Sequence, residues 1–140
     1  MVTSQRMVLL VATVTGLLNS EDPVILNENI RPVYFETASY PLAARLQRVQ
    51  GTVVIRAALT EDGRVISASA LSGAKPLLPE CIANVKKWRF RPNTEKAVIV
   101  VYRFKIEGLC NLPCTSHFRF EPPNLAIVMT GEAVVDHGAP

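Results

Sequence analysis

The sequence predicts an α+β fold whose elements follow the order helix, strand, strand, helix, strand, with a short β-rich tail behind them. Three observations between residues 51 and 92 lead to this prediction. Two consecutive runs alternate apolar and polar side chains, as half-buried strands do, and a turn signal separates them. A third run, residues 76–87, places its apolar side chains at helical spacing.

The first two strands are predicted to form a hairpin. One face of residues 52–60 carries Val53, Ile55, Ala57 and Leu59. One face of residues 64–72 carries Ile66, Ala68 and Ala70, opposite Ser67 and Ser69. Asp62-Gly63 between the runs suits a tight reversal, because glycine adopts positive φ without steric cost.

The two helices are predicted before and after this hairpin. Residues 41–50 begin with Pro41, which suits the first turn of a helix, and Gly51 ends the segment. In residues 76–87 one stripe is apolar, and the buried positions expected there and just beyond are Leu78, Cys81, Ile82, Val85, Trp88 and Phe90. The opposite stripe carries Glu80, Asn84, Lys86 and Lys87. The helices are therefore amphipathic and need a sheet to cover.

Residues 97–106 alternate again and form the third predicted strand. The hairpin strands are antiparallel, and the helix between the second and third strands is a crossover, so the third strand runs parallel to the second. Its place is beside the first strand and antiparallel to it. The prediction is a three-stranded antiparallel sheet in the order 2-1-3, with two helices on one face. The third strand is left with an open edge.

An ordered set of short motifs runs through these elements. The set is Tyr40-Pro41, Gly51-x-Val53, Asp62-Gly63-x-Val65, Ser72-Gly73, Leu78 and Lys87-Trp88-Arg89-Phe90-x-Pro92. It resembles the C-terminal domain of the TonB family over residues 40–107, about half of the chain. Pro79 departs from the family pattern, in which an acidic residue usually follows the leucine; this changes a helix cap and not the fold.

The resemblance implies a periplasmic module of the energy-transducer family that takes part in transport by binding another protein. The implied partner is an extended peptide, for example the N-terminal plug segment of an outer-membrane receptor. β-Strand addition supplies the mechanism, because an open edge offers unpaired N–H and C=O groups. The residues implied in partner binding are Tyr40, Pro41, Val98, Val100, Val101, Tyr102, Arg103, Phe104 and Lys105.

Two alternatives accompany this interpretation. The N–H groups of Val101 and Arg103 point to one side of the strand and those of Tyr102 and Phe104 to the other, and the sequence does not say which set faces outward. A tail strand, residues 118–121 or 125–130, could instead fold back onto the edge and occupy it. The alternative function is a structural envelope protein that self-associates, as a homodimer for example, through the same fold.

The N-terminal 39 residues read as an export signal and a connector. The apolar run from Met7 to Leu18 has the length of a signal-peptide core, so residues 1–20 are predicted to be a signal peptide and the mature chain to begin near Glu21. A short uncleaved anchor and a hydrophobic N-terminal strand are the alternatives. Residues 21–39 form the predicted linker, with one extended segment at Val33–Phe35. Full TonB proteins have a long proline-rich spacer that this linker lacks, so we do not expect it to transduce energy across an envelope by itself.

Composition indicates a globular protein and not a nucleic-acid binder. Hydrophobic residues make up 49% and charged residues 19% of the chain, unlike a disordered protein. The net charge of +3 is small, and no aromatic-interleaved basic platform or glycine-rich phosphate loop is present. The basic residues nevertheless cluster in one span, which is either a solvated face or a docking surface for an acidic partner or membrane headgroups: Lys86, Lys87, Arg89, Arg91, Lys96, Arg103 and Lys105.

The tail, residues 108–140, has no counterpart in the resemblance. Cys110 and Cys114 are candidates for a disulfide in an oxidising compartment, for a metal site or for two unpaired thiols. The metal site would add His117 and needs a fourth ligand, for which His137 is the other histidine of the chain.

A thiol enzyme would pair Cys114 with His117 or His137, oriented by Asp136. The sequence has no nucleophile elbow and no paired-carboxylate pattern. We therefore expect no enzyme activity, no metal and no cofactor.

Overall fold

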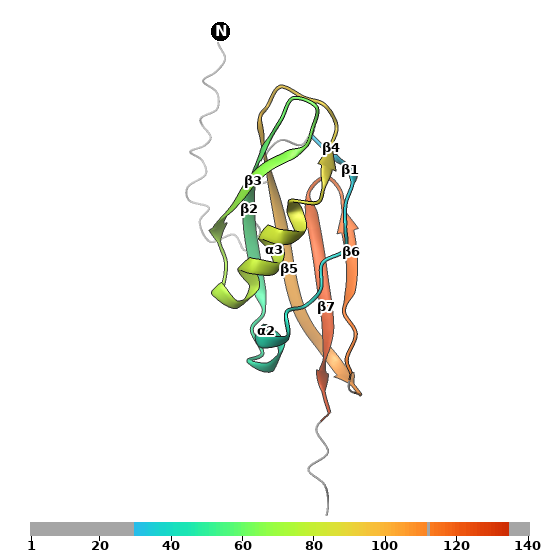
Figure 1. The fold of residues 1–140 in the computed structure, drawn as a ribbon. Coiled ribbons are helices and arrows are strands. Elements are labelled where there is room, and N and C mark those ends of the chain that lie inside the picture. The colour runs from blue at the N-terminus through green and yellow to red at the C-terminus, as the bar shows by residue number, and fades with distance from the viewer. Residues whose placement is uncertain (1–29, 112, 135–140) are drawn as a thin grey trace, which may run out of the picture.

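The computed structural model describes residues 30–111 and 113–134, and all structural statements below refer to them. The predicted signal peptide and the Asp136-His137 pair lie outside these residues. A five-stranded sheet carries two short helices on one face, with a small two-stranded ladder beside them (Figure 1). The elements are β1 (Pro32–Tyr34), α2 (Leu42–Leu46), β2 (Gly51–Leu59), β3 (Val65–Ser72), α3 (Leu78–Val85), β4 (Arg89–Phe90), β5 (Ala97–Cys110), β6 (His117–Glu121) and β7 (Leu125–Ala133).

The three central predicted strands pair as the sequence indicates. β2 pairs antiparallel with β3 and, along its other side, antiparallel with β5. The order β3-β2-β5 is the predicted order 2-1-3. The α+β class and the two helices are thus confirmed in outline, and α3 crosses in front of β2 and β5 in Figure 1.

The prediction of a three-stranded sheet is wrong, because the tail adds two strands to it. The full order is β3-β2-β5-β7-β6, with β7 parallel to β5 and β6 antiparallel to β7. β5 also continues to Cys110, beyond the predicted end at Ile106. The reason is that the backbone groups along β5 find partners in the chain itself, which costs less than leaving a long apolar edge in water.

Some predicted boundaries also change. The first helix is shorter than residues 41–50, because Arg48 adopts positive φ immediately after it. A 3₁₀ turn, Lys75–Leu77, precedes α3. The last strand runs from Leu125 to Ala133 and so continues past residue 130, the end of the predicted tail strand 125–130.

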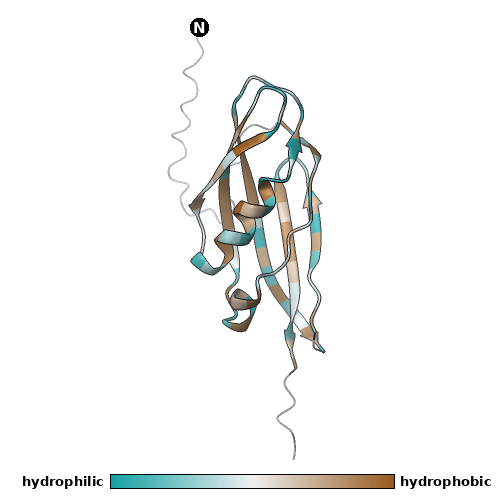
Figure 2. Ribbon diagram, in the orientation of Figure 1, coloured by the Kyte–Doolittle hydropathy of each residue, from teal (hydrophilic) through white to brown (hydrophobic). Residues whose placement is uncertain are grey.

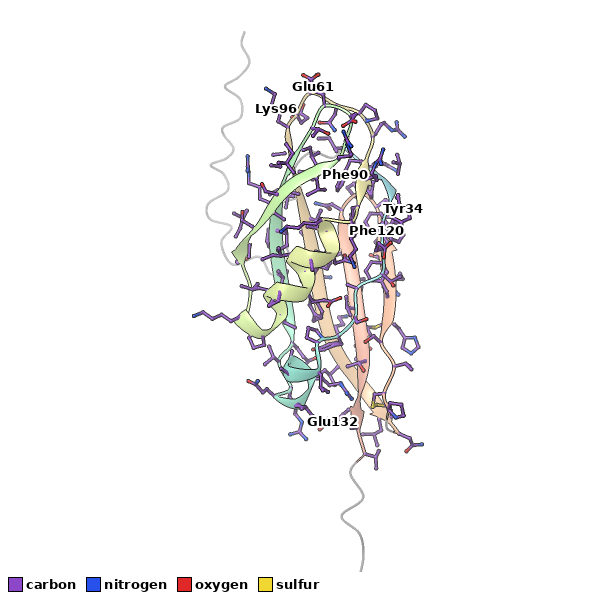
Figure 3. All side chains as sticks on the ribbon, in the orientation of Figure 1. Tyr34, Glu61, Phe90, Lys96, Phe120 and Glu132 are labelled. Atoms are coloured by element: carbon purple, nitrogen blue, oxygen red, sulfur yellow. A yellow bond between two sulfur atoms is a disulfide. The ribbon has the colours of Figure 1, made fainter. Side chains whose placement is uncertain are left out.

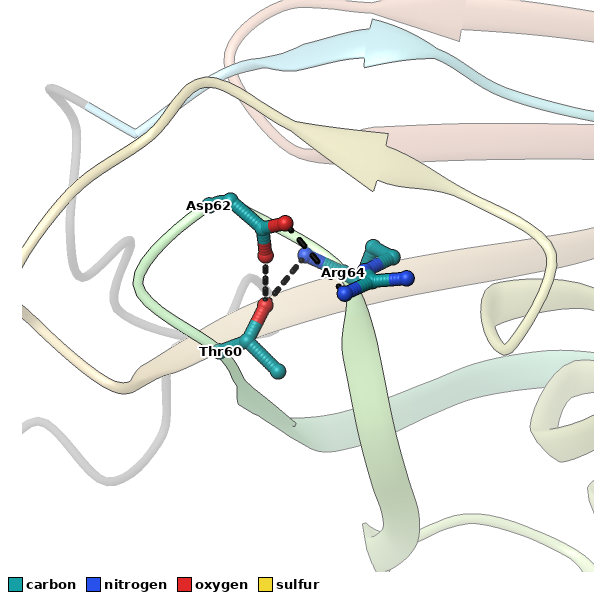
Figure 4. Close-up of polar contacts among 3 residues, drawn as sticks. All are labelled: Thr60, Asp62 and Arg64. Atoms are coloured by element: carbon teal, nitrogen blue, oxygen red, sulfur yellow. Dashed lines mark hydrogen bonds and ion pairs between the residues drawn. The ribbon is translucent and has the colours of Figure 1, made fainter.

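The β2–β3 turn is held by its own polar side chains. The hydroxyl of Thr60 donates a hydrogen bond to the carboxylate of Asp62, and the Arg64 backbone N–H donates to Thr60 Oγ1 at 3.0 Å (Figure 4). The bond from Thr60 lowers the pKa of Asp62, and Arg64 Nη2 lies 3.4 Å from the Asp62 carboxylate. Gly63, next in the turn, has φ of 92° and accepts a bond from the Phe90 N–H at 2.8 Å. The turn signal in the sequence therefore also anchors β4.

The core lies between the sheet and the helices. Figure 2 shows apolar positions running along β2 and alternating with hydrophilic ones along β5. The inward residues of the central strands are buried, as are Cys81 and Val85 of α3. Trp88 and Phe90, at 1% and 2% exposure, are buried as predicted. The connector contributes as well, because Ile30 and Ala38 belong to the same core.

An aromatic cluster joins the tail to this core. The ring of Phe35 lies 4.9 Å from Phe120 and 5.8 Å from both Trp88 and Phe118. Phe120 also meets Trp88 edge to face at 5.6 Å. Figure 3 places Tyr34, Phe90 and Phe120 on the same side of the molecule, away from Glu61 and Lys96 at one end and Glu132 at the other. The tail is therefore packed into the domain.

Candidate functional site

The residues predicted to bind a partner lie together on β5, but this strand is in the interior of the sheet. Val98, Val100, Tyr102 and Phe104 point toward the helices and are buried in the core. Val101 points to the opposite face and is also buried, at 3% exposure. Arg103 and Lys105 on that face are partly exposed.

The expected open edge of β5 is occupied by β7. Their parallel register aligns Val101 with Leu125, Arg103 with Ile127 and Lys105 with Met129. The Val101 N–H donates to the Asn124 carbonyl at 2.9 Å, so the set that contains Val101 and Arg103 faces away from β2 and toward β7. The prediction of an open edge at residues 97–106 is therefore wrong.

Asn124 fixes the start of β7 against β5. It is 2% exposed, and its side-chain amide donates to the Ile99 carbonyl at 2.9 Å. This contact is paired with the backbone bond to Val101 described above, so β7 enters the sheet in a single register. The sequence pattern missed Asn124 because Pro-Pro-Asn reads only as a turn signal.

Tyr40 and Pro41, the other predicted partner-binding residues, contribute to packing. Tyr40 is 6% exposed; its hydroxyl donates to the Val49 carbonyl, and its backbone N–H donates to Ser116 Oγ at 2.9 Å. Its ring meets Phe104 edge to face at 5.2 Å. Burial raises the pKa of Tyr40 to about 12. Pro41 is the N-cap of α2.

A polar hub inside the core, centred on Asn84, was not predicted. The Tyr102 hydroxyl and the Trp88 indole N–H both donate to Asn84 Oδ1, at 2.7 and 2.9 Å. The Asn84 amide donates in turn to the Glu36 carbonyl at 3.0 Å. Asn84 was expected on the polar stripe, yet it is 4% exposed. One buried side chain thus ties α3 to β5 and to the connector.

Two strand edges remain open in the described part of the sheet, those of β3 and β6. β6 is short and carries His117, Arg119 and Glu121, with Arg119 and Glu121 ion-paired at 2.9 Å. Charge on an edge strand discourages pairing with other chains. β3, with the sequence VISASALS, has no charged residue, and its Ile66 and Leu71 are 63% and 58% exposed. The edge of β3 is therefore the better candidate for strand addition.

A shallow hollow lies on one flank of α3. Leu78, Pro79 and Ile82 form its apolar part, and Lys75, Lys86 and Lys87 border it. Leu78 and Ile82 are partly buried against the core. The described residues thus place an apolar surface with a basic rim on the helix that covers β2 and β3.

The cysteines support neither a metal site nor a nucleophile. Cys110 and Cys114 are joined by a disulfide, with Cα atoms 5.6 Å apart, so neither offers a thiolate to a metal or to His117. Cys81 is buried, and burial, followed by the charge of Glu80, raises the pKa of its thiol. In the described ranges no group of three or more potential metal ligands comes together.

The part of the chain that holds the two helices, the Asp62-Gly63 turn and the buried Trp88 and Phe90 is matched by a family model. The model for the C-terminal part of Gram-negative bacterial TonB proteins matches residues 36–107. The chain belongs to the TonB C-terminal family. This confirms the resemblance read from the motifs, and the match ends before the hairpin of β6 and β7.

Among solved structures, the TonB domain resembles the solution structure of the Pseudomonas aeruginosa TonB C-terminal domain. The two are 26% identical, the alignment covers 59% of this chain and 92% of that one, and the TM-score is 0.47. A search of curated proteins gives no match. No helix in the described residues is long and apolar enough to span a membrane.

Proposed function

We propose that this TonB-family domain is a protein-binding module of TonB-linked transport on the periplasmic side of the envelope. Its partner is a peptide segment of an outer-membrane receptor, which adds to the sheet as a further strand. The family match supports the transport role. The observation that carries the mechanism is the open, uncharged edge of β3 in a sheet that is otherwise closed by its own tail or protected by charge.

The β5 residues first considered for partner binding would not bind the peptide while β7 is paired with β5. A peptide can reach the N–H groups of Val101 and Arg103 only if β7 leaves β5. That exchange would expose Ala126 and Val128, which are completely buried, to water. Binding at an edge that is already open avoids this cost, so the proposal places the added strand on β3.

NMR titration tests the proposal directly. Peptides that cover the N-terminal segments of outer-membrane receptors from the source bacterium are added to the ¹⁵N-labelled chain. Saturable shifts in the amide signals of the sheet are expected for at least one segment. If no receptor segment binds, the proposed function is wrong. If the shifts come instead with a loss of the β5–β7 pairing, the receptor displaces the hairpin and uses the residues of β5.

The proposed location has its own test. The apolar run Met7–Leu18 predicts that the mature protein begins near Glu21 and is released by osmotic shock. N-terminal sequencing of the protein in the osmotic-shock fraction should find this start. Membrane-bound protein with Met1 intact would instead indicate an uncleaved anchor.

Self-association is the second candidate function. The exposed Ile66 and Leu71 beside an open edge are the observation that favours it. Light scattering after size-exclusion chromatography separates the two, because only self-association predicts a stable oligomer without added peptide.

A further inference from the structure

We propose that β3 and the adjoining flank of α3 form one groove for an extended peptide. In this peptide apolar residues alternate with polar ones, and acidic residues stand at its ends. This inference rests on the proposed function and names the site and the chemistry of the ligand. The groove lies on the side of the sheet opposite to the hairpin of β6 and β7.

The backbone of β3 presents a defined set of bonding groups at the groove. The Leu59 N–H donates to the Lys96 carbonyl, next to β5, whereas the Thr60 N–H donates to the Arg64 carbonyl, next to β3. Even-numbered residues of β2 therefore bond to β3, which makes Arg56 and Ser69 a hydrogen-bonded pair. Ala68 and Ala70, of the other parity, direct their N–H and C=O groups outward.

Two irregularities set the length of strand that can be added. The pairing of β3 with β2 shifts register near Ile66 and again near Leu71. Bulges of this kind twist an edge and interrupt its pairing. The regular stretch between them suits a short peptide better than a long second sheet, and the exposed Ile66 and Leu71 flank it with apolar surface.

The hollow on α3 adjoins this edge through Leu78 and Ile82. Glu80 and Asn84 bond to the connector, through Ser39 N–H at 2.8 Å and Glu36 carbonyl at 3.0 Å, and so mark one flank of the helix. At 100° per residue, Leu78 and Ile82 lie on the opposite flank. This is the side of β3, because a Cβ on Gly73, next after β3, would come within 3.1 Å of Leu78. Alternate side chains of a strand added to β3 would therefore lie beside Leu78 and Ile82, at the near side of the hollow.

The charges at the hollow select the ligand. Lys75, Lys86 and Lys87 border it, all three are exposed, and none has an ion-pair partner among the described residues. Acidic residues on a peptide would meet these lysines, which improves both the rate of association and the selectivity. A second copy of the chain paired along β3 would bring the same basic rim against itself, so charge favours a peptide over a homodimer.

Fluorescence anisotropy with designed probes tests the groove. The first probe is the labelled peptide Asp-Thr-Val-Thr-Val-Thr-Val-Asp, with a matched probe in which lysine replaces both aspartates. A third probe carries N-methyl groups on alternate residues, which block backbone pairing but keep the side chains. The acidic probe is expected to bind the full chain about tenfold more tightly than either control, a difference of about 1.4 kcal/mol.

Substitutions then locate the binding. Ala68→Pro removes an outward N–H, and the double variant Lys75→Glu with Lys86→Glu reverses the rim; each should weaken binding of the acidic probe about tenfold or more. Arg91→Glu with Lys96→Glu, two exposed positions outside the groove, changes the net charge equally and should retain binding. Circular dichroism checks that Ala68→Pro is folded. If it is not, the two charge variants alone decide whether the acidic probe binds at the groove.

Several results would overturn the groove. Equal binding of the acidic and lysine probes would remove the charge argument, and binding unaffected by both groove variants would remove the site. A dimer that Ala68→Pro dissociates would make a second copy the occupant. Receptor segments that bind the wild type and the groove variants alike would leave the proposed function standing and place it elsewhere, whereas the absence of any binding by receptor segments refutes the proposed function itself.

Discussion

The β2–β3–α3 unit and the β6–β7 hairpin lie at opposite edges of the same sheet, with α3 packed on β2 and β3. Different kinds of interaction fix the positions of the two regions. The β2–β3–α3 unit is held by contacts close in sequence, such as the Thr60–Asp62–Arg64 turn. The hairpin is held by partners far along the chain, such as Phe35 against Phe120 and the N–H of Tyr40 bonded to Ser116. Local patterns therefore specify the first region, while the second depends on a surface that the rest of the fold provides.

The sharpest test of this comparison is to disrupt the hairpin from inside. Val128 is completely buried and aligned with Phe104 on one side and Phe118 on the other. Val128→Asp buries a carboxylate without a partner and should cost about 4 kcal/mol or more of the free energy of unfolding. Thermal denaturation followed by circular dichroism should show that the whole domain loses its cooperative transition.

The neighbouring residue supplies the control. Met129 points to the other face and is only partly buried, so Met129→Asp should lower the melting temperature far less. If residues 108–140 were a separate appendage, neither substitution would affect the transition of the β2–β3–α3 unit.

A second prediction tests a local contact in the first region. A Cβ on Gly63, at φ of 92°, would lie 1.9 Å from the Phe90 carbonyl oxygen. Gly63→Ala should therefore cost about 3 kcal/mol, because strain of the backbone is added to a clash that the β4 segment must relieve. Gly108→Ala is the matched control: Gly108 has φ of 76° but no atom within 4 Å of the added Cβ, so only about 1 kcal/mol is expected. Urea denaturation measures both, and equal losses would mean that the Phe90 contact contributes nothing.

The same contrast explains how much the sequence could predict. Alternation in β2 and β3, the glycine turn and the helical stripe of α3 are local, and they led to the correct order β3-β2-β5. The pairing of β7 with β5 joins Leu125 to Val101, and no local pattern decides whether a tail strand lies against an edge or in solvent. Residue parity also left open which of the two sets of N–H groups on β5 points away from β2. Only the bond from the Val101 N–H to the Asn124 carbonyl decides between them.

The candidate site was predictable in kind but not in position. The resemblance implied that an edge strand receives a peptide, and the basic cluster with Lys86 and Lys87 was visible as a possible docking surface for an acidic partner or membrane headgroups. It could not indicate β3, because the choice depends on which edge the tail covers. Asn84 was misplaced for a related reason. A polar residue beside an apolar stripe reads as exposed, while bonds to Tyr102 and Glu36 from other segments, together with the one from Trp88 four residues on, allow it to be buried.

A third prediction concerns this hub, which connects the first region to β5. Asn84→Ala leaves the Tyr102 hydroxyl and the Trp88 N–H without their acceptor inside the core. We expect a loss of about 2 to 3 kcal/mol in the free energy of unfolding, measured by urea denaturation. Asn93→Ala removes side-chain bonds to Arg91 and Glu95 in an exposed loop and should cost less than about 1 kcal/mol. A hub that acted only locally would make the two losses similar.

The smallest effect is expected at the Cys110–Cys114 disulfide, although it lies at the junction between the family domain and the hairpin. The two cysteines are separated by four positions, so the bond restricts only a short loop of the unfolded chain and contributes about 2 kcal/mol at most. The hairpin does not depend on it for its place, because β7 pairs with β5 as far as Cys110 and Ala133. The double variant Cys110→Ser with Cys114→Ser should therefore keep the wild-type NMR signals of β6 and β7 and melt at a slightly lower temperature.

Mass spectrometry of non-reduced wild-type protein should find a mass lower by two hydrogen atoms in the peptide that contains both cysteines. Free alkylation of both cysteines in protein taken from the periplasm would show that the bond does not form there, and loss of the β7 signals in the double variant would show that the bond, and not the sheet, holds the hairpin.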